Sequence, residues 1–515
     1  MTALRNEVLS AGKHSLIYVV GQAISRAVGF FMIPVYTRFI APSQYGAMEL
    51  IEIVTGAFLM IISMGVADGM SRFYYAEKGI ASRNRVISTI ILGFGALGLP
   101  LVLLLLVCAP ALSSLILEDT RYRECLQIAI VASWFGMLCE VGFTYLRMRY
   151  LAKQFVAITT AQLAAALALN IYFVVYLHWD VLGIFYSTLL TQAATGSLLA
   201  ILLLRQVGCR ISFDLMRQLL TFGLPLVPPQ IGLMLGFSSN RFFLRWFTSA
   251  DPATALAQVG IFSLGHKFGV IINRFINVPF NSFWGPRRLE LLLRDEPHAK
   301  ETVARMCTYA TLCSVFFALI LCANISPIVR LVAAESYRDC WIVVPFVALA
   351  YIATGLETHF KTGILYCRKT MWDTWVSIAA LVVILVWNYA FISRFGLVAA
   401  ATSNLAGFTV RVGLIYFISQ RLYPIPFEVG RISAMLLTAV GLFGVSQFVD
   451  FSSVLLTLSA RTTLVLLFPA VLYLLRFYRD GELEFVEQAV TTLLTRVSHA
   501  KAARLTVAKQ TQIQE

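Results

Sequence analysis

Six basic side chains lie inside apolar stretches long enough to cross a membrane, and they have the clearest capacity for chemistry in this chain. They are Arg26, Arg241, Lys267, Arg274, Lys361 and Arg411. A charge at the centre of a bilayer costs about 2.5–3.5 kcal/mol on insertion scales, so each must be paired with an acid or retained for a function. Fixed positive charge around a cavity within the membrane predicts a negatively charged ligand.

A polar stripe runs through the apolar stretch 259–284. It consists of Ser263, His266, Lys267, Asn273, Arg274, Asn277 and Asn281. Separations of three, four and seven residues place most of them on one helical face. A seam between helices would explain the serine and the asparagines, but two cations on one face repel each other. We therefore predict that the stripe lines a cavity, in which four members contact the ligand: Lys267, Arg274, Asn273 and Asn277.

Arg26 lies close to the middle of the stretch 16–39, too deep for its side chain to reach either interface easily. Gln22 shares a helical face with it. Two explanations stay open. Either both side chains contact the ligand, or Arg26 forms an ion pair with Glu49 or Glu52 of the next stretch.

Three further cations have structural alternatives of their own. Lys361 follows Glu357 by four residues, a spacing that favours an ion pair within one helix. Arg411 lies in the inner half of its stretch and Arg241 in the outer part of its stretch. Each of these two either contacts the ligand or extends to the nearer interface.

Acidic residues also lie inside the apolar stretches, at Glu49, Glu52, Glu140 and Glu357. They could neutralise the cations. They could instead take up a proton or a sodium ion that drives a transport cycle, as acids in transporters do.

Residues 222–229 read FGLPLVPP. A proline inside a helix removes a backbone hydrogen bond and bends the helix. Gly223, Pro225, Pro228 and Pro229 therefore either form a hinge for alternating access or mark a static bend or a late helix start.

Helices within a membrane must position all these residues. A chain of 515 residues with 59% hydrophobic and 13% charged residues has too little polar surface for a soluble protein. Its recurring apolar stretches predict an all-α, polytopic membrane protein with about fourteen transmembrane helices. They cover residues 16–39, 45–69, 86–112, 126–145, 155–177, 182–204, 219–246, 259–284, 306–325, 341–366, 375–392, 397–419, 432–448 and 454–478.

The sequence contains a weak internal repeat. Residues 45–50, YGAMEL, open the second stretch, and residues 259–264, VGIFSL, open the eighth in the same way. Arg38 precedes the first motif, and Arg245 precedes the second. Repeated halves of transporters place a binding site at their interface near the membrane midplane. We therefore predict two pseudo-symmetric six-helix lobes, a C-terminal helix pair and a cytoplasmic tail, with the bounds 1–210, 211–425, 426–479 and 480–515.

The net charge of +14 indicates a membrane orientation rather than nucleic-acid binding. Lys and Arg are concentrated in the even-numbered connections and near the termini, for example at Arg83, Arg85, Arg287 and Arg288. Because the cytoplasmic side of membrane proteins carries this excess, both termini are predicted to be cytoplasmic.

Motifs for catalysis and metal binding are absent from the sequence. It has no GxxxxGKS or GxxxxGKT phosphate loop, no HExxH and no GxSxG. The nine cysteines form no CxxC pair or metal-ligand spacing. We therefore predict no catalytic residue, no metal and no cofactor.

Residues 18–46 resemble the start of Wzx-type polysaccharide flippases. The likeness rests on Gln22, Arg26, Gly29, Phe30, Pro34, Arg38, Tyr45 and Gly46. Residues 69–74, 222–225, 259–286 and 396–426 are similar to that family as well. The resemblance covers nearly all of the first twelve predicted stretches, and the order of these short motifs is more specific than any one of them.

This resemblance implies membership of the multidrug/oligosaccharidyl-lipid/polysaccharide exporter superfamily, with two lobes around a central cavity and alternating access. It implies transfer of an undecaprenyl-diphosphate-linked oligosaccharide between the leaflets of the bacterial inner membrane. Partners would be membrane lipids and assembly proteins such as a polysaccharide polymerase.

The resemblance also implies roles for individual residues. Cavity cations of related flippases receive the diphosphate, and Arg26 and Arg274 match them by both depth and helix. We predict that Lys267 binds the diphosphate as well, and that Gln22, Asn273 and Asn277 bind oxygen atoms of the sugar or the phosphate. Many relatives carry an acid where this chain has Asn240, which puts an acid-dependent role at this position in doubt.

Three other functions stay open. An ion-coupled multidrug antiporter on the same fold predicts a cavity rich in acids, whereas cations predominate here. A lipid II flippase shares the mechanism and differs in cargo. A membrane-embedded glycan polymerase or ligase predicts a long external loop with a catalytic Arg or His, and the sequence has no such loop.

Overall fold

The computed structural model describes residues 32–479 and Glu482, apart from the side chains of residues 66–68. All regular structure in these residues is helical, and twelve helices are long and apolar enough to cross a membrane. Helices satisfy their backbone hydrogen bonds internally, as a hydrocarbon environment requires. The chain is therefore a polytopic all-α membrane protein, which confirms the predicted fold class.

The first half of the described chain forms the helices α2 to α10. Their bounds are α2 (Ile33–Phe39), α3 (Pro42–Ser63), α4 (Val66–Ala76), α5 (Ile80–Ser88), α6 (Gly95–Leu117), α7 (Arg123–Met148), α8 (Ala152–Asn170), α9 (Asp180–Val207) and α10 (Phe213–Gly223). A π-helical segment, η1 (Thr89–Phe94), joins α5 to α6, so residues 80–117 form one long apolar helix.

The second half forms the helices α11 to α21. Their bounds are α11 (Val227–Phe237), α12 (Ser239–Phe247), α13 (Pro252–Gly269), α14 (Val278–Leu293), α15 (Ala299–Val332), α16 (Val343–Phe360), α17 (Thr362–Tyr366), α18 (Met371–Leu422), α19 (Val429–Gln447), α20 (Val454–Leu466) and α21 (Phe468–Leu474). Three short segments connect some of them: η4 (Leu224–Leu226), η5 (Asn273–Asn277) and η6 (Glu335–Ile342).

Every predicted apolar stretch from the second onward falls in one of these helices or in a run of adjoining ones. Helix α18 contains two of them, 375–392 and 397–419, on either side of a bend at Gly396. Gly396 has φ 50° and ψ −120°, a conformation that residues with a Cβ atom rarely adopt. Of the first stretch, 16–39, only the end belongs to the described residues.

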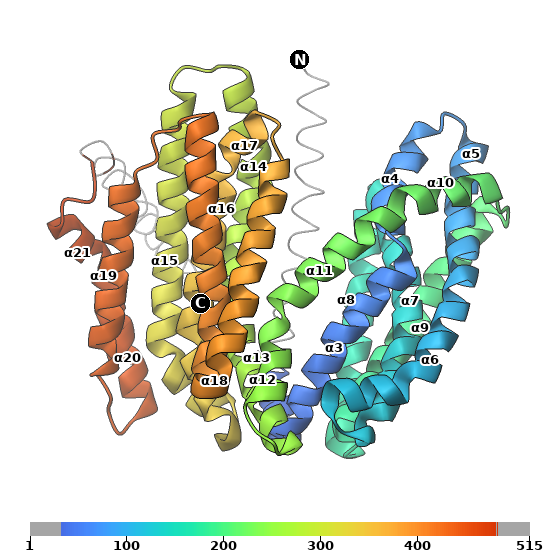
Figure 1. Cartoon of the computed structure of the whole chain (residues 1–515), viewed down its shortest axis with the longest axis horizontal. Coiled ribbons are helices and arrows are strands. Elements are labelled where there is room, and N and C mark those ends of the chain that lie inside the picture. Colours follow the sequence, from blue (N-terminus) through green and yellow to red (C-terminus); the bar gives the residue numbers. More distant parts are fainter. Residues whose placement is uncertain (1–31, 480–481, 483–515) are drawn as a thin grey trace, which may run out of the picture.

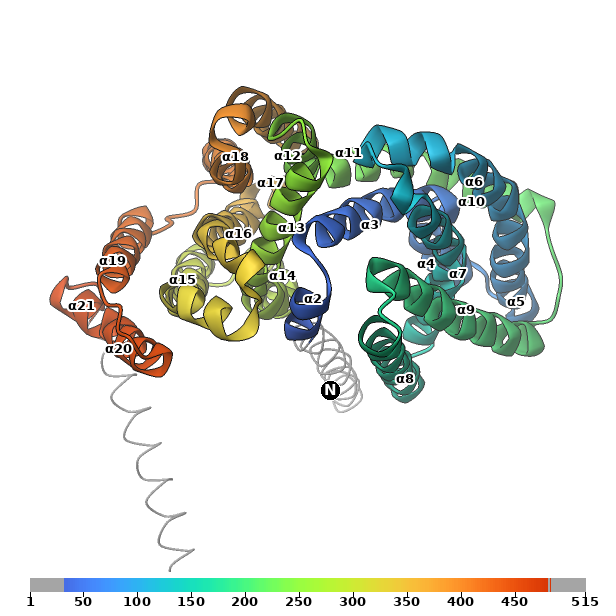
Figure 2. The same ribbon diagram turned by 90° about the horizontal axis from the view of Figure 1, so that it is seen from below.

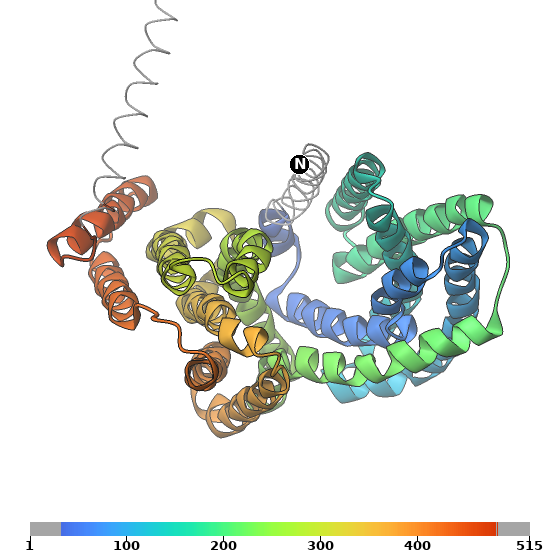
Figure 3. The same ribbon diagram turned by 90° about the horizontal axis from the view of Figure 1, so that it is seen from above.

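The helices form two groups that meet at one end of the molecule and diverge toward the other (Figure 1). The first group holds α3 to α10 and the second holds α12 to α18. At the end where they meet, α3 packs along α13 (Figure 2). At the diverging end, α10 packs on α4 and α5–η1, and α11 crosses from there to α18 (Figure 3).

Helices α19 to α21 lie beyond α15 at one edge of the molecule (Figure 1). Arg461 of α20 donates hydrogen bonds to the carbonyls of Val449 and Ala323 at 2.8 and 3.0 Å, and Ala323 belongs to α15. At the start of α19, a side-chain nitrogen of Arg431 lies 2.7 Å from the carboxylate of Glu482. Burial opposes ionisation of Glu482, but hydrogen bonds from Arg431 and other donors lower the pKa of this carboxyl below its usual value.

Candidate functional site

Helices α3 and α13 touch along their backbones where the two groups meet. A Cβ atom on Gly46 would lie 1.9 Å from the carbonyl oxygen of Leu256, and one on Gly260 would lie 2.1 Å from that of Pro42. Two facing glycines thus bring the helices closer than any side chain would permit. They occupy equivalent positions in the internal repeat, YGAMEL and VGIFSL.

Beyond this pair of glycines, Lys267 of α13 reaches across to α3. Its Nζ lies 2.5 Å from Oε1 of Glu49 and donates a hydrogen bond to the Tyr45 hydroxyl at 2.7 Å. The side chain of Glu49 is 8% exposed, whereas that of Lys267 is 35% exposed. Lys267 therefore has a carboxylate partner and also an accessible side. We call the residues Gly46, Glu49, Gly260 and Lys267 the α3–α13 contact.

Arg241 of α12 lies beside this contact and is buried. Its Nε donates to the hydroxyl of Ser263 at 3.1 Å, and its guanidinium lies 5.0 Å from the centre of the Phe262 ring. Its charge also acts on Glu49. The side chain is therefore held within the bundle and does not extend to the outer interface, which was the alternative explanation from the sequence.

Arg274 lies in η5 and is exposed. Arg241, Lys267 and Arg274 all interact electrostatically with His266 of α13. Three of the predicted ligand cations are therefore close enough to influence the same side chain. Glu52, on α3, is also exposed, and Lys267 acts on its charge as well. The site thus contains acids as well as cations.

The other sequence-predicted residues are less close to this contact or cannot be placed. Glu140 lies on α7 in the first group. Arg26 and Gln22 lie outside the described residues, and so does the alternative ion pair of Arg26 with Glu49 or Glu52.

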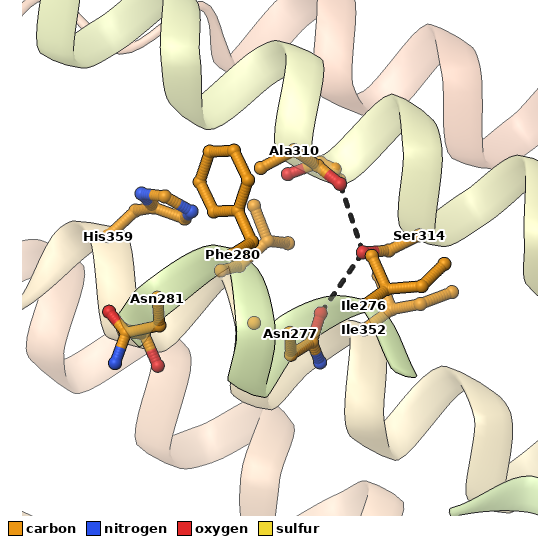
Figure 4. A pocket seen from close by; sticks show the side chains of 12 residues that line it. Ile276, Asn277, Phe280, Asn281, Ala310, Ser314, Ile352 and His359 are labelled. Carbon is orange, nitrogen blue, oxygen red and sulfur yellow. Dashed lines mark hydrogen bonds between the residues drawn. The ribbon is translucent and has the colours of Figure 1, made fainter. Parts of the chain in front are cut away.

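Asn277 takes part in a contact among η5, α15 and α16. Its Nδ2 donates to the carbonyl of Tyr351 at 2.8 Å, and its Oδ1 accepts from Ser314 at 3.0 Å (Figure 4). Asn273 accepts a longer bond from it at 3.5 Å. The adjoining cavity, also lined by His359, has a volume of about 20 Å³, which holds one water molecule. The structure thus places Asn277 in a seam between helices.

Arg411 and Lys361 belong to a second cluster of charges, between α16 and α18. Arg411 lies 3.1 Å from Glu357 and 3.2 Å from Asp373, and Lys361 pairs with Asp373. The ion pair predicted between Lys361 and Glu357 is therefore wrong, because Asp373 in the first turn of α18 supplies the partner. Arg411 bridges two acids and does not extend to the interface. The sequence analysis missed Asp373 because it precedes its apolar stretch.

Arg411→Met is expected to lower stability, because Glu357 and Asp373 would then share one cation. Leaving a buried charge unpaired typically costs about 3–5 kcal/mol, and the Arg411 side chain is only 16% exposed. Thermal unfolding in detergent measures this loss. Arg287→Gln, which removes an exposed pair with Glu290, is the matched control, with a loss under about 1 kcal/mol. Wild-type thermal stability of Arg411→Met would contradict a structural role.

The predicted hinge residues lie where α10 gives way to α11. Gly223 ends α10, Pro225 lies in η4, and Pro228 and Pro229 lie in the first turn of α11. Prolines in a first turn remove no helical hydrogen bond, so they suit the start of a new helix. A Cβ atom on Gly223 would lie 2.3 Å from the carbonyl oxygen of Met64, at the junction of α3 and α4. The two bends therefore pack directly against each other.

Arg245 joins the two groups near the α3–α13 contact, a role that the sequence analysis missed. It is among the largest fully buried side chains, and it donates to the carbonyl of Leu117 at 2.7 and 3.1 Å and pairs with Glu118 at 3.0 Å. Burial opposes ionisation of the neighbouring Asp119, but hydrogen bonds from Arg121 lower the pKa of its carboxyl. The spacing of Arg245 four residues after Arg241 was the one signal that it faces inward.

Arg245→Met is expected to destabilise the protein more than Glu118→Gln does. The methionine leaves the Leu117 carbonyl without its donor, which typically costs about 1–3 kcal/mol. Glu118 is 51% exposed, so water replaces the partner that Glu118→Gln loses. Thermal unfolding of both variants in the same detergent tests this order, and equal melting temperatures would contradict it.

Two buried amides, Asn240 and Asn388, form a polar contact between α12 and α18. Asn240 donates to the carbonyl of Ala400 at 3.3 Å, and Asn388 donates to Ser239 at 3.0 Å. These bonds join α12 to α18. Within the described residues, no group of three or more His, Cys, Asp or Glu side chains could hold a metal ion. Neutral side chains therefore supply the polar contacts here.

Sequence comparison connects the chain to polysaccharide synthesis. The sequence model of the polysaccharide biosynthesis protein family matches residues 11–288. Protein 1 of the Lsg locus of Haemophilus influenzae is 31% identical over 77 residues, or 15% of this chain. That match spans only 19% of the length of the Haemophilus protein.

Solved structures share the fold. The lipid II flippase MurJ in an inward closed conformation superposes with a TM-score of 0.72 at 12% identity, over 89% of this chain and 99% of that one. An inward-facing multidrug resistance MATE transporter gives a TM-score of 0.56 at 17% identity, over 80% and 98% of the two chains. A MOP superfamily transporter from Pyrococcus furiosus gives 0.53 at 15% identity, over 82% and 96%. Since the family match extends over more than half of the sequence, this chain belongs to the polysaccharide biosynthesis protein family.

Proposed function

We propose that this protein carries an undecaprenyl-diphosphate-linked oligosaccharide across the bacterial cytoplasmic membrane by alternating access, for the synthesis of a surface polysaccharide. The supporting observation is that Lys267 of the α3–α13 contact and the buried Arg241 both interact with Glu49, and that these two cations and Arg274 all interact with His266. A diphosphate offers several charged oxygens, which Arg and Lys bind through charge-assisted hydrogen bonds. Membership of the polysaccharide biosynthesis protein family favours this cargo.

In this proposal, residues 1–210 and 211–425 act as the two lobes, and α10 of the second lobe packs on α4 and η1 of the first. The space between the lobes opens to the cytoplasm. The diverging end of the molecule holds α4, α5 and α10, with Arg72, Arg83 and Arg217. In membrane proteins, connections rich in Lys and Arg face the cytoplasm. The proposal therefore places the diverging end on the cytoplasmic side and keeps both termini on that side, as predicted from the sequence. The substrate would then enter from the cytoplasm, and the α3–α13 contact would close the outer side.

The proposed roles of single residues follow from their exposure and partners. Arg274 is exposed and would contact the diphosphate. Arg26, which lies outside the described residues, is proposed as a second diphosphate ligand from the sequence alone. Glu52 is the acid best placed to bind a coupling ion, because it is exposed while Glu49 already pairs with Lys267. The helix pair 426–479 lies outside this path, at one edge of the molecule. Assembly proteins such as a polymerase are proposed as further partners.

Purified protein in vesicles tests the function directly. A labelled lipid-linked oligosaccharide is placed in the inner leaflet, and its arrival outside is measured with a glycan-degrading enzyme added to the medium. Faster arrival than in protein-free vesicles supports the proposal. No acceleration contradicts it.

Cell assays separate the alternative cargoes. Deletion in the native bacterium is expected to remove the surface polymer and to accumulate the lipid-linked oligosaccharide inside. Rescue of cells that lack a lipid II flippase would instead favour lipid II as cargo. Dye efflux without any effect on the polymer would favour a drug antiporter.

A further inference from the structure

Lys267 is the one residue of the α3–α13 contact that both holds the two helices together and faces accessible space. The glycines Gly46 and Gly260 bring the backbones together. Glu49 then meets Lys267 at 2.5 Å with most of its surface covered. Separation of α3 from α13 must break this ion pair, because its two members belong to different helix groups.

The burial of Glu49 makes its charge depend on Lys267. Removing one member of a buried ion pair strongly destabilises the arrangement, because the other charge is left without compensation. Glu49 is 8% exposed and needs this partner as long as the helices stay in contact. The Lys267 side chain is 35% exposed, so part of it faces open space while the helices stay in contact.

The local charges also limit how an anion can bind to Lys267. Glu49 lies 2.5 Å from Nζ of Lys267, so the carboxylate compensates the charge of this lysine while the two stay paired. The nearby Arg241 and Arg274 attract an anion to the same place. A diphosphate bound there competes with Glu49 for Lys267.

We infer that Lys267 exchanges partners: it holds α3 against α13 through Glu49 when the site is empty, and a lipid diphosphate draws it away and thereby weakens the α3–α13 contact. This inference rests on the proposed function and adds the step that couples ligand binding to opening. The contact then opens only after the cargo has bound, which prevents the protein from completing a transport cycle without cargo.

Distance measurements between spin labels test the exchange. Arg121 and Glu335 are 81% and 82% exposed at the end where the groups meet, one in each group, so Cys at both positions carries the labels. The exposed Cys108, Cys209 and Cys313 are replaced by Ser. The protein is studied in nanodiscs with and without undecaprenyl diphosphate.

The labelled wild-type sequence is expected to show a short distance alone and a second, longer one with the ligand. Glu49→Gln is expected to raise the ratio of long to short distances at least about tenfold without ligand. The double variant Glu49→Lys/Lys267→Glu, in which the two charges are swapped between the helices, is expected to restore the short distance. It is also expected to abolish the response to the ligand. Glu124→Gln, an acid of α7 away from α13, is the control and keeps wild-type distances.

Two results would overturn the inference. The first is a short distance in Glu49→Gln, a variant that needs no ligand and therefore tests the contact even if the proposed function is wrong. The second is saturating binding of undecaprenyl diphosphate to the labelled wild-type sequence with an unchanged distance. Failure of the ligand to bind at all, combined with opening of Glu49→Gln, would instead count against the proposed cargo.

Discussion

Gly46→Ala is expected to reduce delivery of surface polymer at least about tenfold, because the alanine prevents α3 and α13 from meeting. Its Cβ atom would lie 1.9 Å from the carbonyl oxygen of Leu256 and 2.9 Å from the nitrogen of Gly260. Both are backbone atoms, so neither can rotate away. Overpacking typically costs about 1–3 kcal/mol, and 1.4 kcal/mol already changes an equilibrium tenfold.

Polymer at the cell surface and the distance between the spin labels on residues 121 and 335 measure this effect together. The distance is expected to lengthen without any ligand. Gly232→Ala and Gly441→Ala are matched controls, because a Cβ atom at either position has no other atom within 4 Å. Wild-type polymer in Gly46→Ala at normal expression would show that the close approach of α3 and α13 is dispensable for transport.

Arg274→Gln is expected to weaken the binding of undecaprenyl diphosphate by about tenfold or more. A hydrogen bond to a charged group contributes about 1.5–3 kcal/mol, and Arg274 is exposed beside two further cations. Arg274→Lys keeps the charge and loses the planar pair of donors, so it is expected to retain part of the affinity.

Titration of the purified variants with undecaprenyl diphosphate provides the measurement. Arg287→Gln removes an exposed arginine from the second half of α14 and serves as the control for net charge. Thermal unfolding of Arg274→Gln in the same detergent shows whether a loss of affinity comes with a loss of stability. Equal affinity of Arg274→Gln and wild type would remove Arg274 from the proposed binding site.

The fold was predictable from the sequence to a large extent, because its signals are local. A membrane helix must be apolar over some twenty residues whatever it packs against. The predicted stretches therefore coincide with helices, even where Gly396 bends α18 between two of them. The repeat YGAMEL and VGIFSL likewise placed Gly46 and Gly260 at equivalent positions before any contact was known.

The partners of the charged residues were much less predictable. The sequence suggested Glu357 for Lys361 because the two lie four residues apart, yet Asp373 of the next helix is the partner. Arg245 gave little sign that it would be buried against the end of α6. Ion pairs between helices depend on how the helices are arranged, and neither spacing nor hydropathy records that arrangement.

The sequence by itself determined that this protein is a helical membrane protein with positive charges in its interior, since composition and periodicity are properties of the chain alone. Only the tertiary structure decided which of these charges are neutralised. It joined Lys267 to Glu49 and to Tyr45, which is 222 positions away, and it enclosed Arg411 between two acids. The physical reason is that a charge is compensated by whichever group the fold brings within a few ångströms, however distant that group is along the chain.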